Sequence, residues 1–191
     1  MNVYDFDKTI YAGDSTLDFY WYCLGRHPAL IKHVHKQLWA GLLYAAGKIG
    51  ITEFKECFFS FLPEVPMLEE QVEKFWDLRQ KRIKAWYLEQ KQSDDVIISA
   101  SPSFLLIPIC KRLKIALPIA TEADPLSGKI TGENCKGEEK VRRFFERYPR
   151  AEVQAFYSDS ATDSPLAALA REAFLVRGDM RMPWPQPHEG Q

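Results

Sequence analysis

Tyr4-Asp5-Phe6-Asp7-Lys8-Thr9 follows a short apolar stretch and forms a D-x-D-x-T pattern. Carboxylates at positions i and i+2 project to the same side of an extended strand. Where the chain turns at the end of such a strand, one carboxylate can face a substrate while the other points past it. The pattern therefore predicts a carboxylate nucleophile with a carboxylic acid beside it, both near a divalent cation.

Three later segments also place polar side chains at the expected ends of strands or helices. They are 94–102 with Ser99 ending an apolar strand, 135–141 with Lys136 and Lys140, and 153–163 with Asp159 and Asp163 after another apolar strand. Because ligands of a parallel sheet bind at the carboxyl ends of its strands, the four segments together predict one site.

In their order, the four segments resemble the motifs of the haloacid dehalogenase-like (HAD) superfamily, in particular subfamily IB, the group that includes phosphoserine phosphatase. The resemblance runs from residue 4 to about residue 165. It implies an enzyme, a phosphoric monoester hydrolase that depends on Mg²⁺ and passes through an aspartyl-phosphate intermediate. Asp5 is then the nucleophile. Asp7 protonates the leaving oxygen and later activates water.

The same resemblance implies how the phosphate is held. The Ser99 hydroxyl and the Ala100 amide emerge at the edge of the sheet as donors for a phosphoryl oxygen. A lysine offsets the charge on the nucleophile and the phosphate. Phosphoserine phosphatase-like relatives carry it before a glycine, which matches Lys136, and other members carry it in G-x-x-K, which matches Lys140. The two lysines are expected one helical turn apart on a shared face, and the choice between them stays open.

Oxygen ligands are implied for the metal. The carboxylates of Asp5 and Asp159 and the backbone carbonyl of Asp7 are expected to hold Mg²⁺, a hard ion that keeps several waters. Asp163 is expected in a supporting position, where it orients a water or the lysine.

Substrate recognition is implied by a further acidic residue. Asp14 lies nine residues after Asp5, where phosphoserine phosphatases carry a glutamate that binds the substrate amine. Those enzymes also bind the substrate carboxylate through an arginine, yet no arginine occurs between Arg26 and Arg79. This departure counts against phosphoserine, because lysine lacks the planar fork of arginine.

The pattern of apolar residues predicts an α/β fold: a Rossmann-like parallel sheet core of residues 1–12 and 88–178, with an inserted helical segment at 13–87. The insert occupies the position of a helical C1 cap. Residues 179–191 contain three prolines after position 182 and are expected to form a loose tail. The expected helices are 29–46, 52–62, 67–90, 102–113, 137–148 and 165–171, and the expected strands after the first are 96–99, 115–120, 153–158 and 173–176.

Composition excludes several classes of protein. The 191 residues carry a net charge of −1, so the sequence lacks the excess of positive charge that is typical of nucleic-acid-binding proteins. The sequence contains no run of about 18 apolar residues, the length needed to span a bilayer, and no signal peptide is recognised. A cytoplasmic location is therefore expected. The four cysteines have no C-x-x-C spacing, which favours reduced thiols. The oligomeric state is left open.

Two alternatives to a phosphatase of small soluble esters remain. Aromatic residues are frequent in the insert and lie near Lys32, Lys36 and Lys48. This composition favours weak contact with a membrane surface, and hence a lipid head-group phosphatase. A non-catalytic module that binds a phosphate ester is the other alternative.

Overall fold

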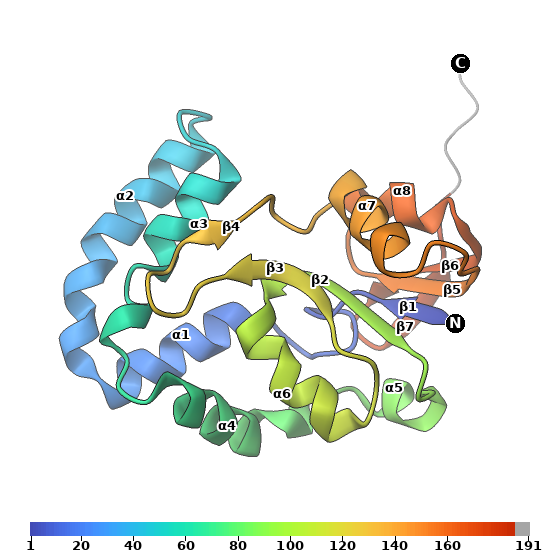
Figure 1. Cartoon of the computed structure of the whole chain (residues 1–191), viewed down its shortest axis with the longest axis horizontal. Coiled ribbons are helices and arrows are strands. Elements are labelled where there is room, and N and C mark those ends of the chain that lie inside the picture. Colours follow the sequence, from blue (N-terminus) through green and yellow to red (C-terminus); the bar gives the residue numbers. More distant parts are fainter. Residues whose placement is uncertain (186–191) are drawn as a thin grey trace.

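The central sheet has seven strands in the order β4-β3-β2-β1-β5-β6-β7 within residues 1–185, the part of the chain that the computed structural model describes (Figure 1). The strands are β1 Asn2–Tyr4, β2 Val96–Pro102, β3 Ile119–Ala123, β4 Ile130–Thr131, β5 Val153–Ser158, β6 Ala170–Arg177 and β7 Met180–Pro183. Strands β3, β2, β1, β5 and β6 run parallel. The edge strands β4 and β7 pair antiparallel with β3 and β6. The predicted α/β class is confirmed.

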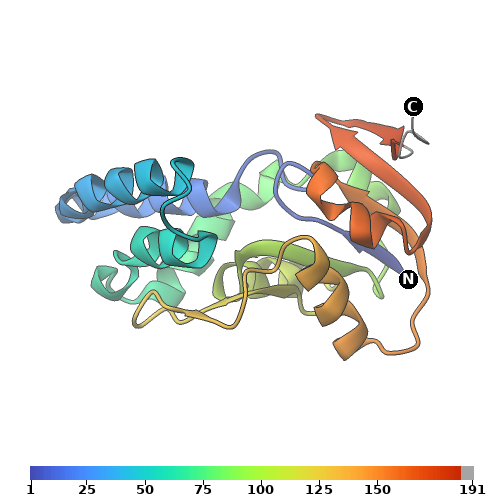
Figure 2. The ribbon, with the colours of Figure 1, turned by 90° about the horizontal axis from the view of Figure 1, so that it is seen from above.

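The helices are α1 Ser15–Arg26, α2 Val34–Ala45, α3 Ile51–Phe59, α4 Leu68–Arg79, α5 Ala85–Gln90, α6 Ser103–Leu113, α7 Glu138–Arg147 and α8 Ser164–Ala167. Helices α1 to α5 lie between β1 and β2 in the sequence. In Figure 2, α1, α2 and α3 lie at one end of the molecule and β6 and β7 at the other.

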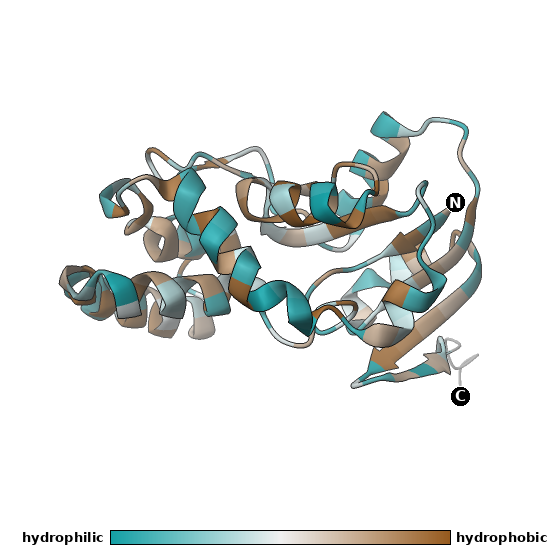
Figure 3. Ribbon diagram, turned by 90° about the horizontal axis from the view of Figure 1, so that it is seen from below, coloured by the Kyte–Doolittle hydropathy of each residue, from teal (hydrophilic) through white to brown (hydrophobic). Residues whose placement is uncertain are grey.

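Two apolar clusters bury the two faces of the sheet. Alternate residues of a strand point to opposite faces, so Ile97 joins the cluster that contains α6, while Val96 and Ile98 join the cluster that contains α7 and α8. Figure 3 shows hydrophobic colouring along much of the central strands. Such continuous apolar runs are typical of parallel strands that are covered on both faces.

The order of the chain reverses beside β1. Val3 pairs with Val96 of β2 on one side and with Phe156 of β5 on the other. In a doubly wound sheet this switch point opens a crevice at the carboxyl ends of the strands. The ends of β1, β2 and β5 therefore meet at one place.

The inserted segment leaves and rejoins the sheet through two stretches of backbone that lie side by side. Tyr11 forms an antiparallel bridge with Ile83, and the Lys84 amide donates to the Ile10 carbonyl at 2.8 Å. The segment also shares the apolar core, because Trp76 of α4 is fully buried and packs edge-on against Phe6 at a ring separation of 5.9 Å. No helix among residues 1–185 combines the length and apolar character needed to cross a bilayer.

Several predicted helices are shorter than expected. The helix expected at 29–46 begins at Val34, after a 3₁₀ turn that starts at Pro28. The helix expected at 67–90 is interrupted after Arg79, because Ile83 pairs with Tyr11 instead. The helix expected at 165–171 ends at Ala167, because β6 already begins at Ala170.

The expectation of a loose tail is wrong for residues 180–185. Gly178 adopts a φ of +57° and turns the chain, so that Met180–Pro183 form β7 against β6. The Trp184 amide then donates to the Ala173 carbonyl at 2.8 Å. The three prolines indicated a loop instead of this short edge strand. Proline is tolerated on an edge strand, because the N–H donor that it lacks can be on the side that faces solvent. Residues 186–191 lie outside the described part of the chain.

Candidate active site

The ends of three neighbouring strands supply the candidate functional residues. Asp5 and Asp7 follow β1, Ser99 lies in β2, and Asp159 directly follows β5. Asp5 is almost fully buried, and its amide donates to the Tyr157 carbonyl of β5 at 2.8 Å. The chain turns immediately afterwards, at Lys8, whose φ of +57° is unusual for a residue other than glycine.

A buried lysine connects two of the acidic residues. The Lys140 ammonium donates to Asp5 Oδ1 at 2.7 Å and to Asp163 Oδ2 at 2.8 Å. Ser158 donates to the same oxygen of Asp163 at 2.7 Å. Although burial lowers the pKa of Lys140, the adjacent carboxylates of Asp5 and Asp163 together raise it above its ordinary value. Lys140 is therefore a permanent cation beside Asp5.

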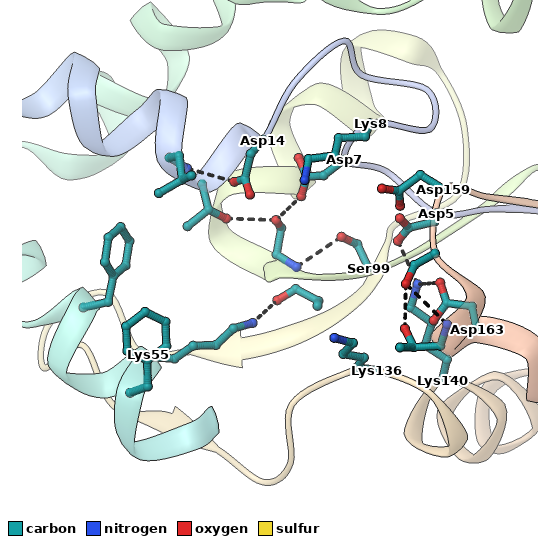
Figure 4. A pocket seen from close by; sticks show the side chains of 18 of the residues that line it. Asp5, Asp7, Lys8, Asp14, Lys55, Ser99, Lys136, Lys140, Asp159 and Asp163 are labelled. Atoms are coloured by element: carbon teal, nitrogen blue, oxygen red, sulfur yellow. Dashed lines mark hydrogen bonds and ion pairs between the residues drawn. The ribbon is translucent and has the colours of Figure 1, made fainter. Parts of the chain in front are cut away.

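The expectation that the two lysines share a helical face is wrong. Gly137 has a φ of +58°, which suits glycine, and α7 begins only at Glu138. Lys136 thus lies in the loop before the helix, exposed but lining the cavity, while Lys140 points inward from the first turn (Figure 4).

Asp7 is held by donors from both sides. The Ser15 amide donates to its Oδ1 at 2.6 Å, and the Ser101 hydroxyl donates to its Oδ2. Burial raises the pKa of Asp7 to about 6, and the nearby Asp14 carboxylate adds to the effect. An acid with this pKa can both give and take a proton near neutral pH.

The end of β2 is irregular where it meets the site. The pairing of β2 with β3 shifts between Ser99 and Pro102, and such bulges re-aim side chains. The Ser101 amide donates to the Ser99 hydroxyl at 3.1 Å. Ser99, Ala100 and Ser101 all line the cavity.

Asp14 and Asp159 also line the cavity, each with a structural contact. Asp14 is the N-cap of α1, and its Oδ1 accepts from the Leu17 amide at 3.0 Å. The Asp159 amide donates to the Thr9 hydroxyl at 2.9 Å, which connects the ends of β1 and β5. Thr9 is the last residue of the D-x-D-x-T pattern and is fully buried.

Lys55 is a cavity residue that the sequence analysis did not identify. It reaches from α3, and its ammonium donates to the Ala100 carbonyl at 2.7 Å and to Asn134 Oδ1. Burial lowers its pKa to about 8. In Figure 4 it lies across the pocket from Lys140 and Asp163. A lone cation beside Phe54 and near Phe58 of the same helix is the signal that could have identified it.

The cavity has a volume of about 440 Å³ and two unlike walls. The sheet edge contributes carboxylates, hydroxyls and lysines. The insert contributes mostly apolar side chains, those of Leu17, Phe54, Phe58 and Phe59, together with Asp14, Thr16 and Lys55. All predicted site residues line this one cavity: Asp5, Asp7, Asp14, Ser99, Ala100, Lys136, Lys140, Asp159 and Asp163.

The carboxylate oxygens at the sheet edge are suitable ligands for a hard cation. No group of three His, Cys, Asp or Glu side chains with metal-binding geometry occurs within residues 1–185, so a third protein ligand would have to come from a backbone carbonyl. In Figure 4 the carboxylates of Asp5 and Asp159 lie next to each other. Burial raises the pKa of Asp159, although the nearby cations of Lys8, Lys140 and Arg177 oppose this effect.

The fold and the site together define an α/β enzyme with an acidic centre at the switch point of its sheet. The model of the haloacid dehalogenase-like hydrolase family matches residues 3–168, and the chain belongs to this family. The predicted resemblance is confirmed, and the chain is a hydrolase. No curated protein matches the chain.

Solved structures share the fold at low sequence identity. A Bordetella pertussis Tohama I protein of unknown function has 21% identity and a TM-score of 0.73, with 92% of this chain and 88% of that chain covered. A phosphoserine phosphohydrolase-like protein from Francisella tularensis subsp. tularensis SCHU S4 has 17% identity and a TM-score of 0.54, with 92% and 87% covered. A phospho-aspartyl intermediate analogue of phosphoserine phosphatase has 16% identity and a TM-score of 0.51, with 91% and 84% covered.

Proposed function

We propose that the chain is a phosphatase that hydrolyses a phosphate monoester through an aspartyl-phosphate intermediate, with Asp5 as the nucleophile. One observation carries the proposal: Asp5 is buried at the switch point of the sheet and bonded to Lys140 at 2.7 Å. A cation held there offsets the negative charge that gathers when a carboxylate approaches a phosphate. The phospho-aspartyl form of a phosphatase with the same fold is consistent with this chemistry.

The first step transfers the phosphoryl group to the enzyme. An Asp5 oxygen attacks phosphorus, the bond from phosphorus to the ester oxygen breaks, and Asp7 gives its proton to the leaving oxygen. Ser99 and the Ala100 amide would hold the transferred phosphoryl oxygens. Lys140 is the lysine of this step, and Asp163 positions it through their 2.8 Å contact.

The second step releases phosphate. Asp7, now ionised, takes a proton from a water that attacks the phosphorus of the acyl-phosphate, and the Asp5 carboxylate is regenerated. Burial keeps the pKa of Asp7 at about 6, which suits both halves of the cycle. The hydrogen bonds from Ser15 and Ser101 hold its carboxyl group in place.

Mg²⁺ is the metal that we propose for this site. Asp5, Asp159 and the Asp7 carbonyl would hold it, because they offer oxygen ligands alone. When bound, the ion neutralises charge on the phosphoryl oxygens and orients the ester.

Phosphate release from p-nitrophenyl phosphate tests the proposal. We expect turnover with Mg²⁺, none with EDTA, and a fall of at least about a thousandfold in Asp5→Asn. Asp94→Asn is the matched control, because Asp94 is exposed at the opposite end of β2. Mg²⁺-dependent turnover by purified Asp5→Asn would refute the assignment. Binding of a phosphate analogue without turnover on any ester would instead indicate a non-catalytic module.

A further inference from the structure

The outward side of α2 is apolar. Leu38, Trp39 and Leu42 lie within about one turn of this helix, and each is 62–66% exposed. The opposite side is also occupied, because Gln37 and Ala40 are buried against the rest of the insert. A helix that is apolar on its solvent side as well as its packed side is expected to be covered on both.

Two neighbouring elements also carry exposed apolar side chains. Ile31, in the 3₁₀ turn before α2, is 66% exposed, and Trp21 of α1 is 62% exposed. Both elements lie at the end of the molecule farthest from β6 and β7 in Figures 1 and 2. We call the residues Trp21, Ile31, Leu38, Trp39 and Leu42 the α2 surface.

The charged side chains of residues 19–52, the segment that contains the α2 surface, are all basic. No acidic residue occurs between Asp18 and Glu53, a stretch that contains four basic residues and three histidines: Arg26, Lys32, Lys36, Lys48, His27, His33 and His35. Lys32 pairs with Glu64 at 2.7 Å, while Lys36 and Lys48 are exposed. Since the whole chain has a net charge of −1, the remainder is negative and the positive charge is concentrated beside the α2 surface.

We propose that the α2 surface docks on an anionic lipid bilayer. Trp and Leu side chains enter the boundary between headgroups and acyl chains, where indole rings are favoured. Lys36 and Lys48 lie at the level of the lipid phosphates, with their stems along apolar surface. A second copy of the chain is a poorer occupant, because a two-fold contact would bring the same cations together.

One residue of the α2 surface, Trp21, lies close in sequence to a residue of the cavity wall. Leu17 lies one turn before Trp21 on α1 and lines the cavity. On the packed side of α2, Tyr44 stacks on Phe54, another lining residue, at a ring separation of 5.2 Å. If the proposed phosphatase function holds, on which this step rests, the substrate is an amphiphilic phosphate monoester. Its apolar part stays with the bilayer while its phosphate reaches Asp5.

Flotation with vesicles tests the docking and needs no turnover. The full chain is mixed at low salt with vesicles of phosphatidylcholine alone, or of phosphatidylcholine with phosphatidylglycerol. We expect flotation only with the anionic vesicles, and its loss in Trp39→Ser/Leu42→Ser. Met180→Ser, at an equally exposed apolar residue of β7, should float normally. Lys36→Glu should lower the partition coefficient by about fivefold or more, whereas Lys111→Glu, at an exposed residue of α6, should not.

Two results of the flotation assay would overturn the docking. One is an absence of flotation with anionic vesicles. The other is equal flotation of the double variant and the Met180→Ser control. A dimer in sedimentation that dissociates in the double variant would assign the surface to a second copy instead.

Vesicles that contain phosphatidic acid, a lipid phosphate monoester, test the substrate class. We expect phosphate release that falls at least about tenfold in Trp39→Ser/Leu42→Ser, with p-nitrophenyl phosphate turnover unchanged. No release from these vesicles by protein that hydrolyses p-nitrophenyl phosphate would overturn the amphiphilic substrate. Failure on both esters would count against the phosphatase itself, and flotation would still decide the docking.

Discussion

Replacing each of the two candidate lysines by methionine separates their roles. Methionine keeps the length of the lysine side chain but removes its charge and its donors. Lys140 is almost fully buried between Asp5 and Asp163, whereas Lys136 is exposed at the mouth of the same cavity. The pair is therefore matched in chemistry and differs in burial.

Lys140→Met leaves two buried carboxylates without their cation. Breaking a buried ion pair costs about 3–5 kcal/mol. For a chain of this size, each kcal/mol lowers the melting temperature by roughly 2–4 °C, so the expected loss is roughly 6–20 °C. The loss of charge stabilisation at the proposed nucleophile, Asp5, should also lower kcat by at least about a hundredfold. Lys136→Met should change the free energy of unfolding by less than about 0.5 kcal/mol and kcat by less than about tenfold.

Thermal unfolding followed by circular dichroism measures the first quantity. Phosphate release, assayed well below the melting temperature of the weaker variant, measures the second. The reasoning would be refuted if Lys136→Met abolished turnover while Lys140→Met left both turnover and stability intact. In that case the lysine that precedes glycine would be the catalytic one.

Three further predictions concern other parts of the molecule. Burial raises the pKa of Asp95 from 3.8 to about 6, so the folded protein holds this proton more tightly than the unfolded chain. Stability from this group is present below pH 4 and is lost as the pH rises to about 6, so urea unfolding should show Asp95→Asn more stable than the parent at pH 8 but not at pH 4. Gly128 has a φ of +72°, and an added Cβ would lie 2.5 Å from the Phe59 carbonyl oxygen. Gly128→Ala should therefore cost about 2 kcal/mol or more in urea unfolding, and Gly178→Ala, with a φ of +57° but no neighbour within 4 Å, should cost clearly less. Burial lowers the pKa of Lys55 to about 8, so KM for an anionic ester should rise as the pH passes about 8. This rise should be absent in Lys55→Met, and a KM profile that is the same in both proteins would contradict the role of Lys55 in binding.

The arrangement of Asp5, Ser99 and Asp159 could be predicted because each follows a short apolar strand and the parallel sheet brings strand ends together. The choice between Lys136 and Lys140 could not. It depends on the positive φ of Gly137, because of which α7 begins at Glu138 and not at residue 137 as expected. A glycine in a sequence permits such a turn without requiring it.

Lys55 was missed for a different reason. It lies about 45 residues from Ala100 in the sequence, and only the packing of α3 over the sheet edge brings the two together. Strand β7 was missed because its hydrogen bonds come from β6 across a tight turn, while the nearby prolines indicated a loop. The position of Lys55 thus depends on a long-range contact, whereas β7 depends on a local hairpin whose pairing overrides the preference of its prolines.

The position of Trp76 bears on how the molecule unfolds. This residue belongs to α4 of the insert, yet its indole donates to the Leu105 carbonyl of α6 at 2.7 Å, and its ring packs against Phe6, the residue that follows Asp5. The insert and the sheet therefore cannot separate without exposing the interior of both. Heat should melt them in one cooperative transition rather than as two independent domains, so the candidate active site and the α2 surface should be lost at the same temperature.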